Sequence, residues 1–155
     1  MSKKLFKNLV LLSNSLILAR LCNIIAESPD GRRALCIDKE NKLKILAYIK
    51  QSPRHMKKWR HIIELILGGH KNPELYDKEE INDKCKGVTA MKFFKGQEND
   101  RIYCKEQATE DGTYIIVTAE ILLKKKSNKV TKKEIPLIEK VGQYEYEIEK
   151  SKNQS

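Results

Sequence analysis

Three β-rich runs with only brief turns between them constrain the fold of this chain more than any other feature. They span residues 88–96, 100–109 and 113–123. Strands joined by turns as short as Asp111-Gly112 pair as antiparallel neighbours. Apolar residues occupy both alternating sets of positions in the last run, which suits a central strand. The sequence therefore predicts a three-stranded meander.

A helix is predicted over residues 53–67. Ser52 is a suitable N-cap, and Pro53 stands at the first helical position, where its missing N–H costs nothing. Gly68 and Gly69 end the helix. One face carries an apolar stripe made of Met56, Trp59, Ile62, Ile63, Ile66 and Leu67. The opposite face is interpreted as a solvated surface and carries Lys57, Lys58, Arg60 and Glu64.

Shorter segments surround these elements. Residues 32–38 are predicted to form a strand, and residues 43–50 suit a helix or a strand equally. Residues 72–87 are expected to be a polar connection with one helical turn. Thr131 and Glu134 form a capping box that opens a final helix, and Ile135, Ile138 and Val141 point inward. Pro136 fits poorly inside that helix.

Helical elements followed by a meander and a final helix predict an α+β fold. We expect a small antiparallel sheet with its helices packed on one face. At 155 residues the chain is long enough for one domain. That domain is placed at residues 31–150, after an apolar extension at 1–30 and before a frayed tail at 151–155.

The extension has two interpretations. Its basic start and apolar stretch are typical of an export signal, although Asn14 and Arg20 interrupt the pattern. A membrane span is not expected. Helical spacing instead favours an additional N-terminal helix, and the residues at that spacing are Leu5, Leu9, Leu12, Leu16 and Ala19.

The cysteines carry no metal-binding pattern. Cys22, Cys36, Cys85 and Cys104 are widely separated, and the histidines do not complete a zinc site. We therefore expect reduced thiols in a cytosolic core, no metal and no cofactor.

Net charge points to a polyanionic partner. The formal charge is +10 with a pI near 9.4, and lysines or arginines that pair with phosphates release counterions. Cations gather on the meander at Lys92, Lys95, Arg101, Lys105, Lys124, Lys125, Lys126 and Lys129. Alternate strand residues share a face, so Arg101, Tyr103 and Lys105 are expected to project together, with Lys92 beside them.

Such a cluster suits attack on a phosphodiester. Negative charge builds on phosphate oxygens in the transition state, where fixed cations stabilise it. In RNA the 2′-hydroxyl is the nucleophile, so no metal-bound water is needed. The alternative is that these lysines keep a sheet edge soluble.

The chain from about Ala34 to Val141 resembles the RelE/HigB superfamily of toxin–antitoxin toxins, particularly its phage-derived HigB-like branch. The resemblance is carried by "CIDKENKLKILAYI", "GVTAMKF", "RIYC", "TYIIVTAEIL" and "LLKKKSNKVTKKEI" in this order. It implies a RelE-like toxin that cleaves mRNA in the ribosomal A site without a metal. It also implies a 2′,3′-cyclic phosphate product and neutralisation by an antitoxin protein.

The resemblance also implies roles for individual residues. Lys92, Arg101 and Tyr103 occupy catalytic positions, with the two cations stabilising the phosphate. The remaining cations, Lys95, Lys105, Lys124, Lys125, Lys126 and Lys129, are expected to contact RNA. Ala90 replaces the Glu of the family's first-strand motif, and no His lies near the C-terminal end. Tyr103 is either a proton donor or acceptor, or an aromatic residue at the edge of the core.

The leading prediction is thus a cytoplasmic endoribonuclease toxin that acts on mRNA on the ribosome and binds a cognate antitoxin. One alternative is a non-enzymatic protein of the same fold, either a ParE-like poison of gyrase or an inactive relative. Another is an exported basic protein, which requires the first 26 residues to be a targeting segment.

Overall fold

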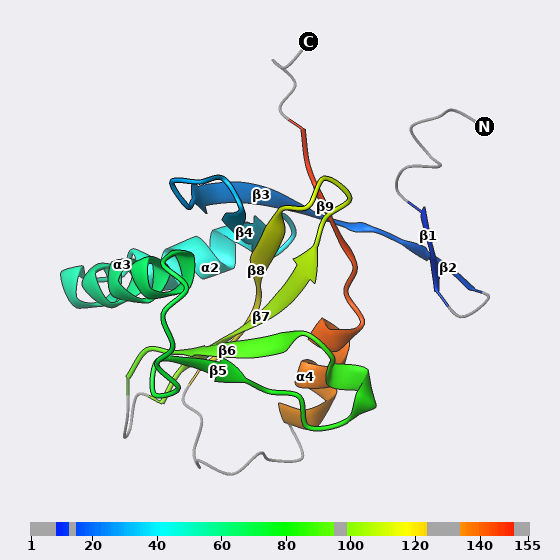
Figure 1. Cartoon of the computed structure of the whole chain (residues 1–155). Coiled ribbons are helices and arrows are strands. Elements are labelled where there is room, and N and C mark those ends of the chain that lie inside the picture. The colour runs from blue at the N-terminus through cyan, green and yellow to red at the C-terminus, as the bar shows by residue number, and fades with distance from the viewer. Residues whose placement is uncertain (1–8, 13–14, 95–98, 124–133, 151–155) are drawn as a thin grey trace.

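The computed structural model describes residues 9–12, 15–94, 99–123 and 134–150 (Figure 1). Its helices are α2 (Lys42–Ile49), α3 (Pro53–Leu67) and α4 (Glu134–Gly142), with a 3₁₀ turn at Asp83–Cys85. The main sheet contains β3 (Arg20–Glu27), β4 (Arg33–Asp38), β5 (Tyr76–Lys78), β6 (Val88–Lys92), β7 (Arg101–Ala108), β8 (Tyr114–Leu122) and β9 (Tyr146–Ile148). A separate hairpin consists of β1 (Leu9–Leu12) and β2 (Ser15–Leu18). The chain is therefore α+β, as predicted.

The main sheet has seven strands in the order β5-β6-β7-β8-β4-β3-β9. The predicted meander is confirmed, because β6, β7 and β8 pair as antiparallel neighbours. The predicted central position of β8 is also confirmed. However, β4 runs parallel to β8 and β9 runs parallel to β3. The sheet is thus mostly antiparallel, as expected, but it is mixed and larger than the small sheet predicted, because segments on both sides of the meander add strands to it.

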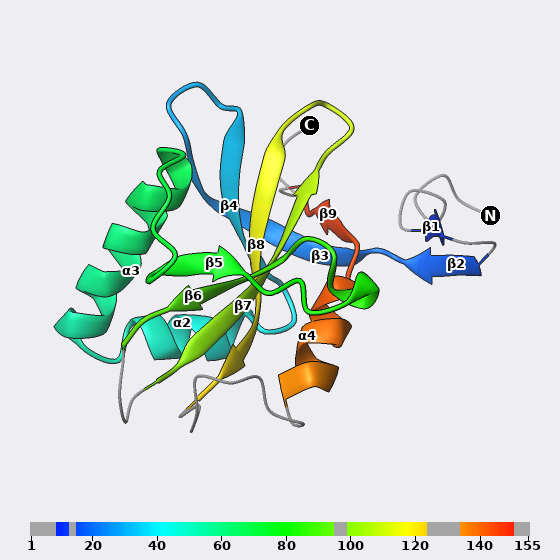
Figure 2. The same cartoon turned by 60° about the horizontal axis from the view of Figure 1, so that its bottom comes forward.

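Helices cover both faces of the sheet, contrary to the prediction of one covered face (Figure 2). Helices α2 and α3 pack on one side, where Ile45 and Ile62 contact a core that includes Met91. Helix α4 packs on the other side, where Ile138 joins a core that includes Ala90. Ala90 and Met91 of β6 thus belong to cores on opposite faces of the sheet, since successive side chains of a strand point to opposite faces.

Helix α3 forms as its sequence predicts. The Ser52 side chain accepts a hydrogen bond from the backbone N–H of His55 at 3.1 Å, and Pro53 begins the helix. Gly69 follows with a φ of 71°, a conformation that glycine adopts without a Cβ clash. The ambiguous segment before α3 is helical, because Ile45 and Ile49 pack against the sheet.

The predicted N-terminal helix is wrong. The described part of this segment forms strands, and β3 pairs with β4 on one side and β9 on the other. Leu9, Leu12 and Leu16 lie in β1 and β2, where pairing between these two strands overrides the helical spacing. Hairpin β1–β2 lies apart from the main sheet in both views (Figures 1 and 2). No helix among the described residues is long and apolar enough to cross a membrane.

The remaining segments complete the two layers. The polar connection contains the expected helical turn and also β5, which was not predicted. The segment that follows α4 forms β9. Pro136 is the third residue of α4, in the first turn, where its backbone nitrogen needs no intrahelical partner. Thr131 and the tail at 151–155 lie outside the described residues.

The four cysteines are buried and form no disulfide.

A buried carboxylate joins four parts of the fold. Asp38, at the end of β4, is fully buried. It forms an ion pair with Arg20 of β3 and accepts a hydrogen bond from the Tyr146 hydroxyl of β9 at 2.5 Å. The backbone N–H of Asn41, just before α2, donates to the same carboxylate at 2.9 Å. Asp38 therefore holds the strands added beside the meander.

We predict that Asp38→Ala lowers the free energy of unfolding by about 3 kcal/mol, because it leaves the buried Tyr146 hydroxyl without its acceptor and removes the buried carboxylate that pairs with Arg20. Urea unfolding followed by Trp59 fluorescence measures the loss. Glu40→Gln is the matched control, since Glu40 also pairs with Arg20 but its side chain is 68% exposed. It should cost less than about 1 kcal/mol. Equal losses in the two variants would contradict a special role for Asp38.

Candidate functional site

Four of the residues predicted to act on RNA lie on two adjacent strands. Lys92 of β6 pairs directly with Arg101 of β7, and Tyr103 and Lys105 follow along β7. Alternation along β7 directs these three β7 side chains to the face covered by α4. Ala90, which stands in place of the family's Glu, is fully buried and pairs with Tyr103. The register thus brings Lys92 beside Arg101, as the sequence suggested.

Arg101 has an unusual environment for a cation. The residue is only 7% exposed, and its Nη1 donates to Asn99 Oδ1 at 2.5 Å and to the Asp100 carbonyl at 3.3 Å. Its Nε is buried without a hydrogen-bond partner. Among the described residues, no carboxylate forms an ion pair with this guanidinium. A buried cation in this state is costly, so an anion or water that binds Nε would stabilise it.

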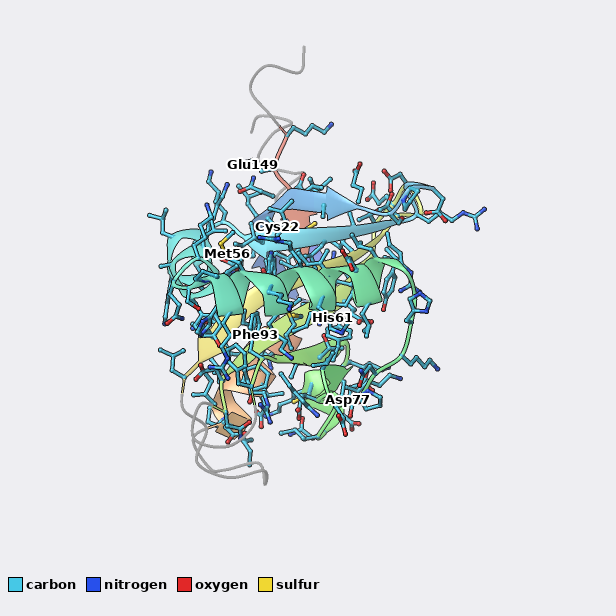
Figure 3. All side chains as sticks on the ribbon, turned by 90° about the vertical axis from the view of Figure 1, so that its left-hand side faces the viewer. Cys22, Met56, His61, Asp77, Phe93 and Glu149 are labelled. Carbon is cyan, nitrogen blue, oxygen red and sulfur yellow. The ribbon has the colours of Figure 1, made fainter. Side chains whose placement is uncertain are left out.

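Lys92 is more accessible but is held at the outer edge of the sheet. Its Nζ donates to the Pro73 carbonyl at 3.1 Å and lies 3.9 Å from the Asp77 carboxylate. Asp77 belongs to the edge strand β5 and is labelled in Figure 3. The Lys92 side chain is 25% exposed. Its amine can therefore leave these weak contacts and turn toward a ligand at low cost.

Tyr103 is part of the core. It is 1% exposed, and its hydroxyl lies 3.4 Å from Glu134 Oε2 on α4. Burial, together with the charge of Glu134, raises the pKa of this phenol. Tyr103 therefore stays protonated at neutral pH and faces α4. Of the two interpretations left open by the sequence, this position favours the aromatic residue at the edge of the core.

Lys105 is also used inside the fold. Its Nζ donates to the Lys86 carbonyl at 3.0 Å and to the Gly142 carbonyl at 2.5 Å. Burial lowers the pKa of this amine. Gly142 is packed so closely that a Cβ there would lie 1.9 Å from the Lys84 carbonyl. Lys105 thus fastens the end of α4 to the sheet, and its amine does not face solvent in this structure.

The remaining predicted cations lie outside the described residues, namely Lys95, Lys124, Lys125, Lys126 and Lys129. The described ends of the lysine run are nonetheless informative. Leu122, at the end of β8, pairs with Arg101, and Glu134 opens α4 close to Tyr103. The described residues on either side of the run, Leu122 and Glu134, thus lie beside Arg101 and Tyr103 of β7.

A second cationic region was interpreted from the sequence only as a solvated surface. It comprises the outward side of α2 and α3, and we call it the basic α3 surface. Residues 41–63 contain no Asp or Glu. The exposed basic residues of this stretch are Lys44, Lys50, Arg54, Lys57, Arg60 and His61. The missing acidic residues were a visible signal of this surface.

The basic α3 surface contains a hollow of about 440 Å³. Its wall is formed by Arg54, Lys57, Lys58, His61 and Phe94. The Arg54 guanidinium lies over the Phe94 ring, 3.8 Å from its centre. Phe94 follows β6 in the chain, so only the tertiary structure brings this aromatic ring to α3.

A third polar region is a cleft of about 290 Å³ beside β5 and β6. Glu106 lies in this cleft and accepts hydrogen bonds from the hydroxyls of Tyr76 and Tyr114, the latter at 2.5 Å. Thr89 donates to the Tyr76 hydroxyl at 2.7 Å. Both oxygens of Glu106 are thus engaged by the protein itself. No group of three or more His, Cys, Asp or Glu side chains is placed to hold a metal ion in the described ranges.

Comparisons with protein-family models, with curated proteins and with solved structures gave no match.

We predict that the free energy of unfolding falls steeply above about pH 10, the ordinary tyrosine pKa. Burial raises the pKa of five tyrosines, Tyr76, Tyr103, Tyr114, Tyr144 and Tyr146. A raised pKa means that the folded state keeps protons which the unfolded chain loses, so stability is lost as the pH rises. The lowered pKa of Lys105 acts in the opposite direction but involves a single group.

The measurement is urea unfolding at a series of pH values from neutral to strongly alkaline, with tyrosine ionisation followed at 295 nm. Tyrosine absorbance should rise together with the loss of structure. A free energy of unfolding that stays level through pH 11 would contradict the buried, protonated state of these phenols.

We also predict that Lys105→Met lowers the free energy of unfolding by about 2 kcal/mol, because the Lys86 and Gly142 carbonyls lose a shared donor. Lys84→Met is the control, since that side chain is 65% exposed and should change stability by less than about 0.5 kcal/mol. Thermal and urea unfolding distinguish the two. If Lys105→Met were as stable as the control, its amine would be available for another role, such as RNA contact.

Proposed function

We propose that the chain is a cytoplasmic toxin with a RelE-like core that cleaves mRNA on the ribosome and is neutralised by an antitoxin protein. The strand, turn and helix over β4 and α2, followed by the meander and α4, stand in the order that the sequence resemblance implies. This order supports the proposal but is shared by other α+β folds. The chemistry of one residue carries it further.

The observation that carries the proposal is the buried, incompletely paired guanidinium of Arg101. Arginine binds phosphate through several N–H groups in a fixed plane, and its charge is not lost at any physiological pH. A phosphate bound beside Arg101, at the end of β7, would supply the acceptor that Nε lacks. We call this place the Arg101 edge. A partly buried cation also interacts more strongly with developing negative charge than an exposed one.

In the proposed reaction, the RNA 2′-oxygen attacks the adjacent phosphorus and the bond from phosphorus to the 5′-oxygen breaks. The products are a 2′,3′-cyclic phosphate and a 5′-hydroxyl. The 2′-hydroxyl loses its proton and the departing 5′-oxygen gains one. Arg101 and Lys92 stabilise the charge on the phosphate oxygens, while Lys124, Lys125, Lys126 and Lys129 contact the RNA backbone. The proposal assigns Tyr103 to the core and does not use it for proton transfer.

A second candidate function is favoured by a specific observation. The side chains of Tyr103 and Lys105 are occupied inside the fold, which leaves fewer polar groups for catalysis at this edge. A non-enzymatic relative of the same fold, acting by binding gyrase or another protein, fits that arrangement. It does not explain why the buried Nε of Arg101 lacks a hydrogen-bond acceptor.

We predict that induced expression in bacteria arrests growth and produces cuts in translated messages, and that Lys92→Ala with Arg101→Ala abolishes both. Removing transition-state contacts of this kind costs roughly 100-fold or more in rate. The measurement is sequencing of RNA 5′ ends before and after induction. Lys84→Ala with Lys140→Ala is the matched control, because it removes the same charge from exposed positions beside α4.

Each outcome distinguishes the candidates. Cuts that persist in the Lys92 and Arg101 variant would place the chemistry elsewhere. Growth arrest without cuts would favour the binding function over the nuclease. If neither arrest nor cuts occur while the protein is folded, as judged by circular dichroism, the toxin proposal is overturned.

A further inference from the structure

We infer that the basic α3 surface is a binding site for single-stranded RNA, separate from the Arg101 edge. The inference rests on the proposed function for the choice of RNA among polyanions. It assigns to α2 and α3 a role that does not depend on cleavage. Figure 3 looks onto α3 from outside, with His61 and Phe93 labelled on the same side of the helix.

The first support is charge segregation. The stretch from residue 41 to residue 63 contains seven Lys or Arg and no acidic residue, and the next carboxylate on α3 is Glu64. Other lysines on the described surface lie beside carboxylates in sequence-distant segments: Lys39 pairs with Glu149 and Lys140 with Glu120. Exposed like charges repel one another, and an anionic ligand would relieve the repulsion among Lys57, Lys58 and Arg60 on α3.

The second support is the spacing of the hollow's residues along α3. Arg54, Lys57, Lys58 and His61 are related by steps of three and four residues, so they lie on one side of the helix. They extend over about 10 Å at 1.5 Å per residue. That length accommodates more than one backbone phosphate.

The third support is the aromatic ring in the hollow. Arg54 covers one side of Phe94, and Lys58 Nζ lies 6.0 Å from the ring centre. A planar guanidinium held by a ring beneath it is a platform on which an unpaired base can stack. Stacking of this kind accepts any base, whereas a lipid headgroup has no flat surface to place there. The combination of cations and a stacked platform therefore fits single-stranded RNA.

The basic α3 surface also contacts the segments of the chain that carry Lys92 and Arg101. Phe94 lies two residues beyond Lys92 in the chain. Tyr48, at the end of α2, donates to the Asp100 carboxylate at 2.9 Å, and Asp100 directly precedes Arg101. Residues close to Arg101 and Lys92 in the chain thus contact α2 and α3.

The test is fluorescence anisotropy of purified full-length protein with a labelled 12-nucleotide RNA of mixed sequence. All riboses carry 2′-O-methyl groups, which removes the nucleophile and separates binding from cleavage. Lys57→Gln with Lys58→Gln should weaken binding about 20-fold near 0.1 M salt and reduce the salt slope by roughly 1.4, for two lost phosphate contacts. Arg101→Ala should retain most of the affinity.

Lys84→Gln with Lys140→Gln is the control that removes the same charge from the side of α4. It should change the dissociation constant less than about two-fold, since only longer-range attraction is lost. Circular dichroism shows whether each variant is folded. Equal weakening by the two double variants would overturn the inference, because net charge alone would then explain binding. Binding to anionic lipid vesicles without binding to RNA would overturn it as well.

The outcome is separable from that of the cleavage experiment. If the α3 variant loses affinity but the natural protein makes no cuts in cells, the RNA site stands and the nuclease fails. If cuts occur and the α3 variant binds RNA normally, the nuclease stands and this site fails.

Discussion

The ion pair between Asp38 and Arg20 supports the part of the sheet that lies beyond the meander. A fully buried carboxylate is tolerated only when its charge is matched and its oxygens are hydrogen-bonded. Arg20 supplies the charge, and Tyr146 and the Asn41 backbone supply the hydrogen bonds. These groups come from distant segments, so strands β3, β4 and β9 and the start of α2 depend on one another. The Arg20 guanidinium also stacks on Tyr144, 4.2 Å from its ring centre, which extends the network toward α4.

Covering both faces of the sheet has a direct consequence for function. Polar side chains in the middle of β7 lie under α4 and hold the fold together, as Tyr103 and Lys105 do. Among the described cations, those at the end of a strand and on the outward side of a helix are the candidates for ligand binding. Arg101 occupies the first of these places and Lys57 the second. In the described part of the chain, a cation between the sheet and a helix therefore has a structural role. A cation outside these layers is a candidate for ligand binding.

The two candidate surfaces differ in the physical argument behind them. At Arg101 the argument is desolvation, because a buried guanidinium with an unpaired nitrogen is stabilised by any anion that reaches it. On α3 it is electrostatic repulsion among exposed cations, which a phosphate backbone relieves. The first effect acts over a hydrogen-bond distance and suits one phosphate. The second acts over about a Debye length, near 10 Å at 0.1 M salt, and suits a longer strand.

The sequence by itself determined the elements whose signals are local. Alternating apolar residues and short turns specified the meander, while Ser52, Pro53 and the following stripe specified α3. It also placed Lys92 and Arg101 near each other, because adjacent antiparallel strands leave little choice. Only the tertiary structure decided that the N-terminal segment forms strand β3, that α4 covers the second face, and that Tyr103 and Lys105 are buried. The physical reason is that these outcomes depend on pairing between distant segments, as in the contact of β3 with β9, which no local pattern encodes.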